Sequence, residues 1–255
     1  MKHVKYLPII TLLTSQMAFS AQATGPDVKS MQDRWNTVLN GEKITSVEQG
    51  PMDGLYEVSA GSHIFYTDTT GQKLFLGDII QSNGSNQPTN LTEEERQKVR
   101  VTTLKSIPAA GMITYKAKDP KHAIYVFTDS DCGYCRKFHE ERQELLDNGI
   151  TINYLAMPRT PEGTPSYNKA VAIWCAKDPN AALTEAKDDK FKFDDATIND
   201  KQCDNAKKFV ADEVKLARQL GAQGTPTILL ENGELIPGYI PAKELIAFYK
   251  LNPTK

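Results

Sequence analysis

Two cysteines separated by two residues are the clearest sign of chemistry in the sequence. Cys132 and Cys135 follow a continuous apolar run, 123–127, which is typical of a buried strand. A helix that begins at Cys132 would place its thiol where unpaired N–H groups and the helix dipole favour a thiolate, with a pKa below the free value of about 8.5. Cys135 lies one turn further along and can close back on Cys132. The spacing predicts thiol–disulfide exchange, with Cys132 attacking and Cys135 resolving the mixed disulfide.

Other uses of such a pair fit the sequence less well. A c-type haem site needs histidine directly after the second cysteine, where Arg136 stands. Structural zinc needs a second ligand pair, but Cys175 and Cys203 are 28 residues apart and His139 is the only histidine near the motif. A purely structural disulfide within the motif would close too short a loop to constrain the unfolded chain. We therefore expect redox catalysis, with no metal and no organic cofactor.

Cys175 and Cys203 are the two remaining cysteines. In a secreted protein they most simply pair with each other, and closing a loop of this length would contribute about 3–4 kcal/mol in the chain-entropy model. The alternative is a second reactive pair, although neither cysteine lies in a redox motif at a helix start.

A proline motif, Gly224-Thr225-Pro226-Thr227, precedes another apolar run. A trans proline opening an edge strand is the commoner situation. In a thioredoxin-like domain, however, a cis proline at this place faces the active-site cysteines, and the upstream C-x-x-C favours that interpretation. The backbone of Thr225 would then be free to pair with an extended substrate beside Cys132. We therefore predict that Thr225, Pro226 and Tyr134 contribute to substrate binding; simple packing is the alternative role for Tyr134.

The elements that position these residues follow from hydrophobic periodicity. Alternating runs at 55–58, 63–67 and 73–76, with a hairpin loop at 68–71, predict a small antiparallel sheet, and the polar stretch 82–90 predicts a linker or long loop. Thr92 and Glu95 form a capping box that opens a polar helix over 93–106, which stops before a proline and suits a bridge between two domains.

The second half of the chain has the order strand, helix, strand, long helical stretch, hairpin, helix. Its predicted strands are 123–127, 150–155, 227–230 and 235–236, and its predicted helical stretches are 132–147, 167–183, 206–220 and 242–251.

The first residues indicate export. Lys2 and Lys5 precede a 13-residue run, 7–19, that is too short for a membrane span, and Ala21-Gln22-Ala23 offers a cleavage site. We predict a signal peptide over 1–23 and a periplasmic protein with no membrane insertion after its removal.

Composition bounds the remaining possibilities. The chain has 255 residues, 40% of them hydrophobic, so it can bury a core without dense disulfides. Its 30 basic and 32 acidic side chains give no reason to expect nucleic acid as a partner, because phosphate binding needs clustered positive charge.

Several motifs together resemble the DsbC/DsbG family of periplasmic disulfide isomerases, on the DsbC side. They are the runs 112–117 and 125–129, the motif Cys132-Gly133-Tyr134-Cys135, and Gly224-Thr225-Pro226-Thr227. The resemblance implies an α+β chain in which a small antiparallel dimerisation domain (24–90) and a linker helix (91–107) precede a thioredoxin-like catalytic domain with a helical insertion (108–255).

The resemblance also implies binding partners and a structural disulfide. The partners are a second copy of the chain, misfolded secreted proteins with disulfides, and a DsbD-like membrane reductase as electron donor; the structural disulfide is between Cys175 and Cys203. Two features depart from the family pattern. The segment between those cysteines is longer and more acidic than expected, and Asp131 could oppose thiolate formation at Cys132.

The predicted function is therefore protein disulfide isomerisation and reduction, accompanied by chaperone-like client binding. A DsbA-like thiol oxidase and a redox-independent periplasmic chaperone are the alternatives.

Overall fold

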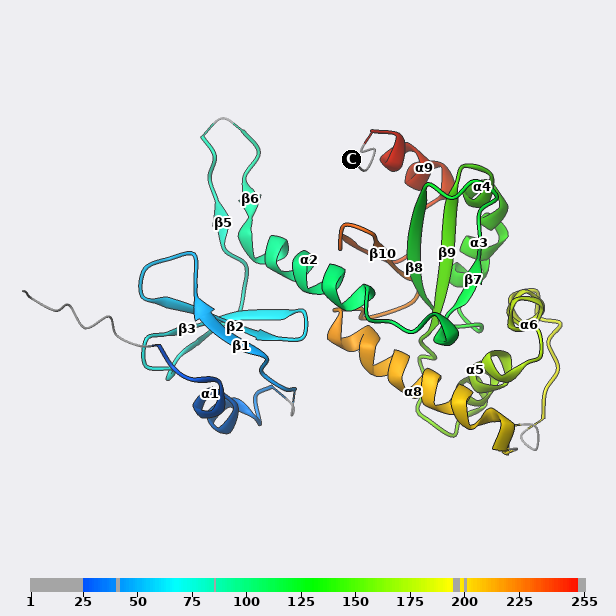
Figure 1. Ribbon diagram of the computed structural model, residues 1–255, viewed down its shortest axis with the longest axis horizontal. Coiled ribbons are helices and arrows are strands. Elements are labelled where there is room, and N and C mark those ends of the chain that lie inside the picture. The colour runs from blue at the N-terminus through cyan, green and yellow to red at the C-terminus, as the bar shows by residue number, and fades with distance from the viewer. Residues whose placement is uncertain (1–24, 40–41, 85, 195–197, 200, 252–255) are drawn as a thin grey trace, which may run out of the picture.

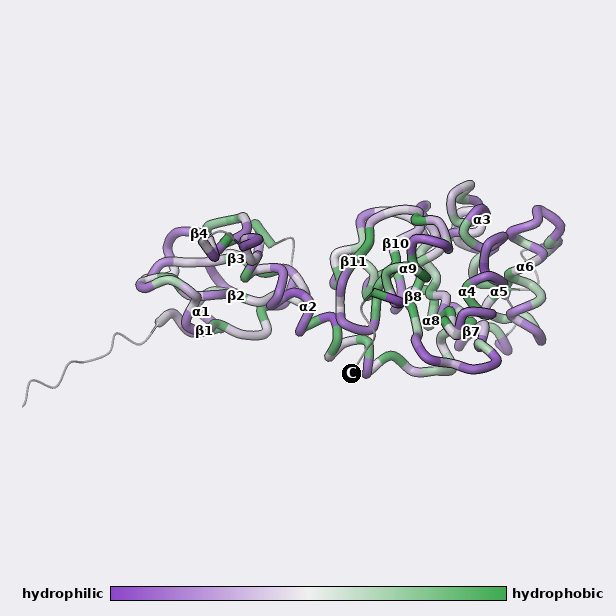
Figure 2. Tube along the Cα trace, turned by 90° about the horizontal axis from the view of Figure 1, so that it is seen from above, coloured by the Kyte–Doolittle hydropathy of each residue, from purple (hydrophilic) through white to green (hydrophobic). Residues whose placement is uncertain are grey.

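Two sheet-containing units lie at either end of a single helix, α2 (Leu91–Leu104), in the computed structural model of the chain (Figure 1). The structure describes residues 25–39, 42–84, 86–194, 198–199 and 201–251. The predicted signal peptide, 1–23, lies outside the described residues. Figure 2 shows α2 as the largely hydrophilic connection between the two units.

The N-terminal unit is a four-stranded antiparallel sheet of order β1-β2-β3-β4, and the alternating runs predict its strands β2, β3 and β4. A core of Met31, Val58 and Phe65 joins it to α1. Gly71 has a φ of 68° in the turn after β3, a conformation that favours glycine. The elements are α1 (Val28–Trp35), β1 (Ser46–Gln49), β2 (Leu55–Ala60), β3 (His63–Asp68) and β4 (Leu74–Phe75).

The predicted linker at 82–90 is partly strand. Two short segments, β5 (Ile80–Gln81) and β6 (Thr89–Asn90), pair antiparallel at its base, with Ile80 opposite Asn90. The prediction of a loop over the whole stretch was therefore wrong at its last two residues.

The capping box predicted at Thr92 is also wrong, because α2 begins two residues earlier than that motif allows. Asn90 is the N-cap, and its side-chain oxygen accepts a hydrogen bond from Glu93 N–H at 2.9 Å. The Thr92 hydroxyl instead serves the N-terminal unit: it accepts from Ile79 N–H at 2.9 Å and bonds the Tyr66 hydroxyl at 2.6 Å. Because both residue types cap helices well, the tertiary contact decides which one does so.

The other end of α2 is held by the C-terminal unit through Arg100. This buried guanidinium pairs with Glu93 at 2.6 Å, and its Nε donates to the Leu220 carbonyl at 3.1 Å. A second nitrogen donates to the Gly233 carbonyl at 3.3 Å. The bridging helix is thus bonded at both ends.

The C-terminal unit contains a five-stranded mixed sheet of order β11-β10-β8-β9-β7, with β8 at its centre and parallel to β9. The predicted central strand, the following strand and the Asn232-Gly233 hairpin are confirmed. The strands are β7 (Ile113–Tyr115), β8 (His122–Thr128), β9 (Ile150–Ala156), β10 (Thr227–Leu230) and β11 (Leu235–Pro237).

Helices cover both faces of this sheet. Alternate residues of β8 and β10 supply the two sides: Ile124 and Ile228 lie in one core, whereas Phe127 and Leu229 pack with residues of α2 and α8 in another. The helical elements are η1 (Ala109–Gly111), α3 (Gly133–Glu140), α4 (Arg142–Asp147), α5 (Pro165–Cys175), α6 (Pro179–Lys187), η2 (Lys201–Cys203), α8 (Asp204–Gln219) and α9 (Ala242–Leu251).

Two predicted helical stretches are each divided in two. The stretch after the cysteines breaks at Glu141, whose carboxylate accepts hydrogen bonds from the Tyr239 hydroxyl and from Ala242 N–H. The stretch 167–183 divides at Asp178, which caps α6 by accepting from Ala181 N–H at 3.0 Å.

The C-terminal end of α8 joins the two units directly. Gly221 (φ 87°) and Ala222 donate back into the last turn and satisfy two of the helix carbonyls. The next carbonyl, that of Gln219, accepts from Ser62 N–H at 2.8 Å in the N-terminal unit. Arg100 serves the carbonyl of Leu220. The helix end is therefore capped by residues far away in the sequence.

We expect Arg100→Ala to lower the free energy of unfolding by about 2–4 kcal/mol, because it removes the ion pair of a buried guanidinium with the half-buried Glu93 and two charge-assisted hydrogen bonds. Urea unfolding measures the change. The matched control is Lys98→Ala on the same helix: Lys98 pairs with Glu95 in an exposed ion pair, so a loss of about 0.5 kcal/mol or less is expected. Equal losses for the two variants would contradict the role given to Arg100.

Candidate active site

The C-x-x-C motif lies at the junction between β8 and α3. Cys132 is the N-cap residue of α3, with an extended backbone, and Cys135 lies in the first turn. Both are buried, with 4% and 1% of their surface exposed. The two sulfurs are not bonded to each other, so the structure represents the dithiol form.

The proline motif faces Cys132 from the neighbouring strand. Strand β10 runs antiparallel to β8 with Thr227 opposite Phe127, so the residues just before Thr227 reach the loop that leads into α3. The Thr225–Pro226 peptide is cis. The Cys132 thiol donates to the Thr225 carbonyl, with 3.2 Å between sulfur and oxygen. The structure thus brings Cys132, Thr225 and Pro226 together although they are far apart in the sequence.

The surroundings of Cys132 favour its thiolate. Burial raises the pKa of the thiol, but hydrogen bonding by the Thr225 side chain and by Cys135, together with the positive charge of Arg159, outweighs that effect and lowers the pKa below its ordinary value. Arg159 is itself fixed by Asp129, whose buried carboxylate accepts from its Nε at 3.0 Å. Arg159 was not recognised in the sequence, because only the fold brings it to the motif.

Asp131 does not oppose the thiolate as its position in the sequence suggested. Its carboxylate pairs with Lys169 at 2.6 Å and lies 3.8 Å from Arg136. Burial raises the pKa of Asp131, yet these cations lower it overall. The negative charge next to Cys132 is therefore already neutralised by two cations.

Cys135 has the opposite tendency. Burial raises the pKa of its thiol above the ordinary value, although the charge of Lys187 and hydrogen bonding by Asp129 and Thr128 work against that rise. Lys187 is a second residue that the motifs did not reveal. It ends α6, in the helical region between β9 and β10, and only 4% of it is exposed.

Tyr134 lies on the surface beside the motif, 64% exposed. Its ring stacks on Tyr239, with 5.9 Å between centroids, and the ammonium of Lys137 lies 4.6 Å from the Tyr239 ring centre. Sequence reasoning did not identify Tyr239. An exposed aromatic pair next to Cys132 can bind the apolar side chains of an incoming chain.

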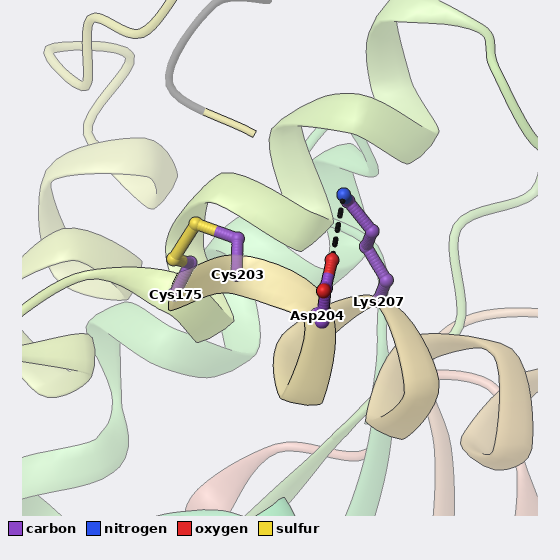
Figure 3. The surroundings of a disulfide bond; sticks show 4 residues. All are labelled: Cys175, Cys203, Asp204 and Lys207. Atoms are coloured by element: carbon purple, nitrogen blue, oxygen red, sulfur yellow. Dashed lines mark hydrogen bonds and ion pairs between the residues drawn. A yellow bond between two sulfur atoms is a disulfide. The ribbon is translucent and has the colours of Figure 1, made fainter. Parts of the chain in front are cut away.

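The remaining cysteines are joined to each other. The Cys175–Cys203 disulfide has a Cα–Cα distance of 5.2 Å and connects the end of α5 to η2 at the start of α8 (Figure 3). In the first turn of α8, Lys207 pairs with Asp204 at 3.1 Å. The Cys175–Cys203 disulfide lies on a different part of the domain from the dithiol, among the helices that cover the sheet.

An open groove of about 570 Å³ leads away from the active site. Arg159 and Gly224 line it on the catalytic side, and Glu42 and His63 line it on the side of the N-terminal unit. A chain that reaches Cys132 along this groove would therefore contact both units.

Across the part of the chain that the structure describes, no group of three His, Cys, Asp or Glu side chains is arranged to hold a metal ion. Among the described helices, none has both the length and the apolar character needed to cross a membrane.

A dithiol at the start of the helix after a central strand, opposite a cis proline, defines a thioredoxin-like thiol–disulfide oxidoreductase. Residues 109–251 match the thioredoxin-like domain family, and residues 21–93 match the N-terminal domain family of disulfide bond isomerase proteins. The chain belongs to the DsbC family of thiol:disulfide interchange proteins. Both the predicted fold class and the resemblance are thereby confirmed.

Individual relatives extend over nearly the whole chain. The chain is 35% identical over 237 residues to thiol:disulfide interchange protein DsbC of Escherichia coli K12, covering 93% of each protein. It is 36% identical over 244 residues to DsbC of Salmonella typhimurium, covering 96% of this chain and 94% of that one. The catalytic domain of Proteus mirabilis ScsC, with a TM-score of 0.50 and 23% identity, covers 62% of this chain and 97% of that domain, a likeness of fold alone.

We expect Arg159→Met to raise the pKa of Cys132, because it removes a positive charge and leaves the buried Asp129 carboxylate beside the two thiols without its cation. The rate of Cys132 alkylation by iodoacetamide at neutral pH should fall by about two- to tenfold. Lys137→Met removes one charge from α3 without touching this network and should change the rate much less. An unaltered alkylation rate in Arg159→Met would remove Arg159 from the account of the thiolate.

Proposed function

We propose that the chain is a periplasmic protein disulfide isomerase and reductase that reshuffles non-native disulfides in secreted proteins. The observation that supports this most directly is the position of Cys132: its pKa is lowered, and its sulfur lies 3.2 Å from the Thr225 carbonyl at the strand edge. The membership in the DsbC family agrees with this function.

The first step is attack on a client disulfide. The Cys132 thiolate forms a bond to one client sulfur, the client S–S bond breaks, and the electron pair leaves on the other client sulfur as a thiolate. The extended client backbone would lie along Thr225 and Pro226, with Tyr134 beside the approach to Cys132. Because Cys132 caps α3, the helix N-terminus faces the sulfur where negative charge resides before attack.

Two routes release the client. A second client thiolate can attack the mixed disulfide, which forms a new client disulfide and regenerates the Cys132 thiolate; this route is isomerisation. Alternatively, Cys135 attacks the Cys132 sulfur and expels a reduced client, leaving the enzyme oxidised. The raised pKa of Cys135 favours the first route, because the resolving thiol is mostly protonated.

The partners follow from this chemistry. Isomerisation needs reduced Cys132 in an oxidising compartment, so a DsbD-like membrane reductase would supply electrons, and the signal peptide at 1–23 would direct export. We assign 24–90 to dimerisation, 91–107 to the linker helix and 108–255 to catalysis. The N-terminal unit suits self-association because Phe75, Leu76 and Ile80 expose 47%, 73% and 54% of their surface.

Client binding in the absence of exchange is a further part of the proposal. The groove between the units is lined by apolar residues, Met157 and Val214, and by the charged residues Glu42, Arg159 and Arg218. Such a surface can hold an unfolded chain through apolar contact while Cys132 samples its disulfides, which would give chaperone-like activity.

Cys132→Ser should reduce the refolding of a small secreted protein with scrambled disulfides to the uncatalysed rate, because no mixed disulfide can form. Cys135→Ser is the matched variant: it should retain isomerisation, since a client thiol can still release Cys132, and lose the capacity to reduce client disulfides. Regain of client enzyme activity measures the first property, and the count of free client thiols measures the second. Full activity in Cys132→Ser would disprove the assignment.

Sedimentation equilibrium of the exported protein should give twice the mass of the mature chain. Leu76→Glu, which places a charge on the exposed apolar segment of the N-terminal unit, should shift the equilibrium toward the monomer without changing Cys132 alkylation. A monomeric unmodified protein would favour the oxidase alternative.

A further inference from the structure

A buried amine lies beneath the dithiol and has no part in the exchange steps above. The Lys187 ammonium donates hydrogen bonds to the Thr128 hydroxyl at 2.7 Å and to the Asp129 carbonyl at 2.9 Å. Both acceptors are neutral oxygens, so the lysine is buried without a direct carboxylate partner. A lysine in such a position is costly as a cation.

The two residues that bond Lys187 also influence Cys135. Hydrogen bonding by the Thr128 side chain and the Asp129 backbone works to lower the pKa of the Cys135 thiol, and so does the charge of Lys187. The three groups therefore form one cluster at the end of β8. As a neutral amine, Lys187 would use two hydrogens for its two oxygen acceptors and keep its lone pair for a proton.

The other charged and titratable groups around Lys187 are not suited to accept a proton from Cys135. From α3, Arg136 is paired with Asp131 and Asp189, and burial lowers the pKa of His139 to about 3. Burial raises the pKa values of Tyr115 on β7 and Tyr154 on β9. The Asp129 carboxylate is bonded to Arg159, and Asp188 pairs with Lys190.

Lys187 itself has a pKa close to the working range. Burial lowers it to about 8, while the two cysteines and Asp129 act in the opposite direction. The amine can therefore exist in both protonation states near neutral pH, as proton transfer requires.

We propose that Lys187 is the proton acceptor for Cys135 and controls resolution of the mixed disulfide rather than the initial attack by Cys132. This inference rests on the proposed exchange function and adds a residue to its reductive branch.

The step is balanced within the cluster. The Cys135 thiol gives its proton to the neutral Lys187 amine, which becomes an ammonium. The Cys135 sulfur then bonds to Cys132 as the Cys132–client bond breaks, and the electron pair leaves on the client sulfur. In the reverse direction, when the electron donor reduces the enzyme, the ammonium returns the proton to the departing Cys135 sulfur.

The test separates the two thiols with 5,5′-dithiobis(2-nitrobenzoate) as the disulfide. Stopped-flow absorbance should show one thionitrobenzoate released by Cys132 at a rate that depends on reagent concentration, and a second released by Cys135 at a rate that does not. In Lys187→Met, the second phase should slow by about tenfold or more at pH 7, and its pH midpoint should rise by about one unit or more. The first phase should change by less than about threefold, because Thr225 and Arg159 remain beside Cys132.

The matched control is Lys190→Met, an exposed lysine near Lys187 whose removal should leave both phases unchanged. A second phase in Lys187→Met with the rate and pH midpoint of the unmodified protein would overturn the inference and leave the exchange function intact. If the unmodified protein showed no concentration-dependent first phase, the exchange function would fail, and the inference with it.

A measurement on the unmodified protein keeps the inference testable if Lys187→Met does not fold. With Lys187 as acceptor, the logarithm of the second-phase rate should level off near pH 8, where the amine titrates. A rate that continues to rise tenfold per pH unit beyond about pH 9 would show that the Cys135 thiol ionises without Lys187 and would overturn the proposal.

Discussion

Holding a thiolate at a nearly dry position is the constraint on which the rest of the structure depends. Burial alone would protonate Cys132, so the fold must supply compensating interactions from several directions. Helix α3 offers its N-terminus, the strand edge offers the Thr225 side chain, and the loop after β9 offers Arg159. These groups come from three separate parts of the chain, and the sheet order β11-β10-β8-β9-β7 brings them to one point.

The site shifts the pKa values of its two thiols in opposite directions. Cys132 lies at the rim, next to groups that donate hydrogen bonds or carry positive charge, and its pKa falls. Cys135 lies one turn deeper, and burial dominates. Because the pKa values of the two thiols are shifted in opposite directions, the mixed disulfide on Cys132 is favoured to persist, which gives a client time to rearrange its own bonds.

Local pattern was enough to predict strands β2 to β4 and β8 to β11, the hairpin at Asn232-Gly233 and the helix after the motif, because periodicity and turn chemistry act over a few residues. It did not predict the short strands β1, β5, β6 and β7. It failed where a tertiary contact chose between local alternatives. Asn90 rather than Thr92 caps α2, since Thr92 is needed by Tyr66 and Ile79. The break at Glu141 depends on a carboxylate that bonds Tyr239 and Ala242, about a hundred residues away in the sequence.

The active site shows the same division. The cysteines and the proline motif have a recognisable spacing, whereas Arg159 and Lys187 belong to no motif and reach the site only through folding. A lysine near the end of a helix is ordinarily expected to be exposed to solvent, where its charge complements the helix dipole. Nothing local distinguishes Lys187 from such a residue, and its burial against Thr128 and Asp129 is a property of the packed domain.

The capping of α8 has a consequence for the modularity of the chain. Two carbonyls at the end of this helix, those of Gln219 and Leu220, accept their hydrogen bonds from Ser62 and Arg100, which lie outside the catalytic domain. That helix covers one face of the central sheet. Cutting the chain after the linker would therefore expose a helix terminus that the catalytic domain cannot satisfy by itself. Separating the two units would also leave Ser62 and Arg100 without these acceptors, so each unit would lose hydrogen bonds that stabilise it.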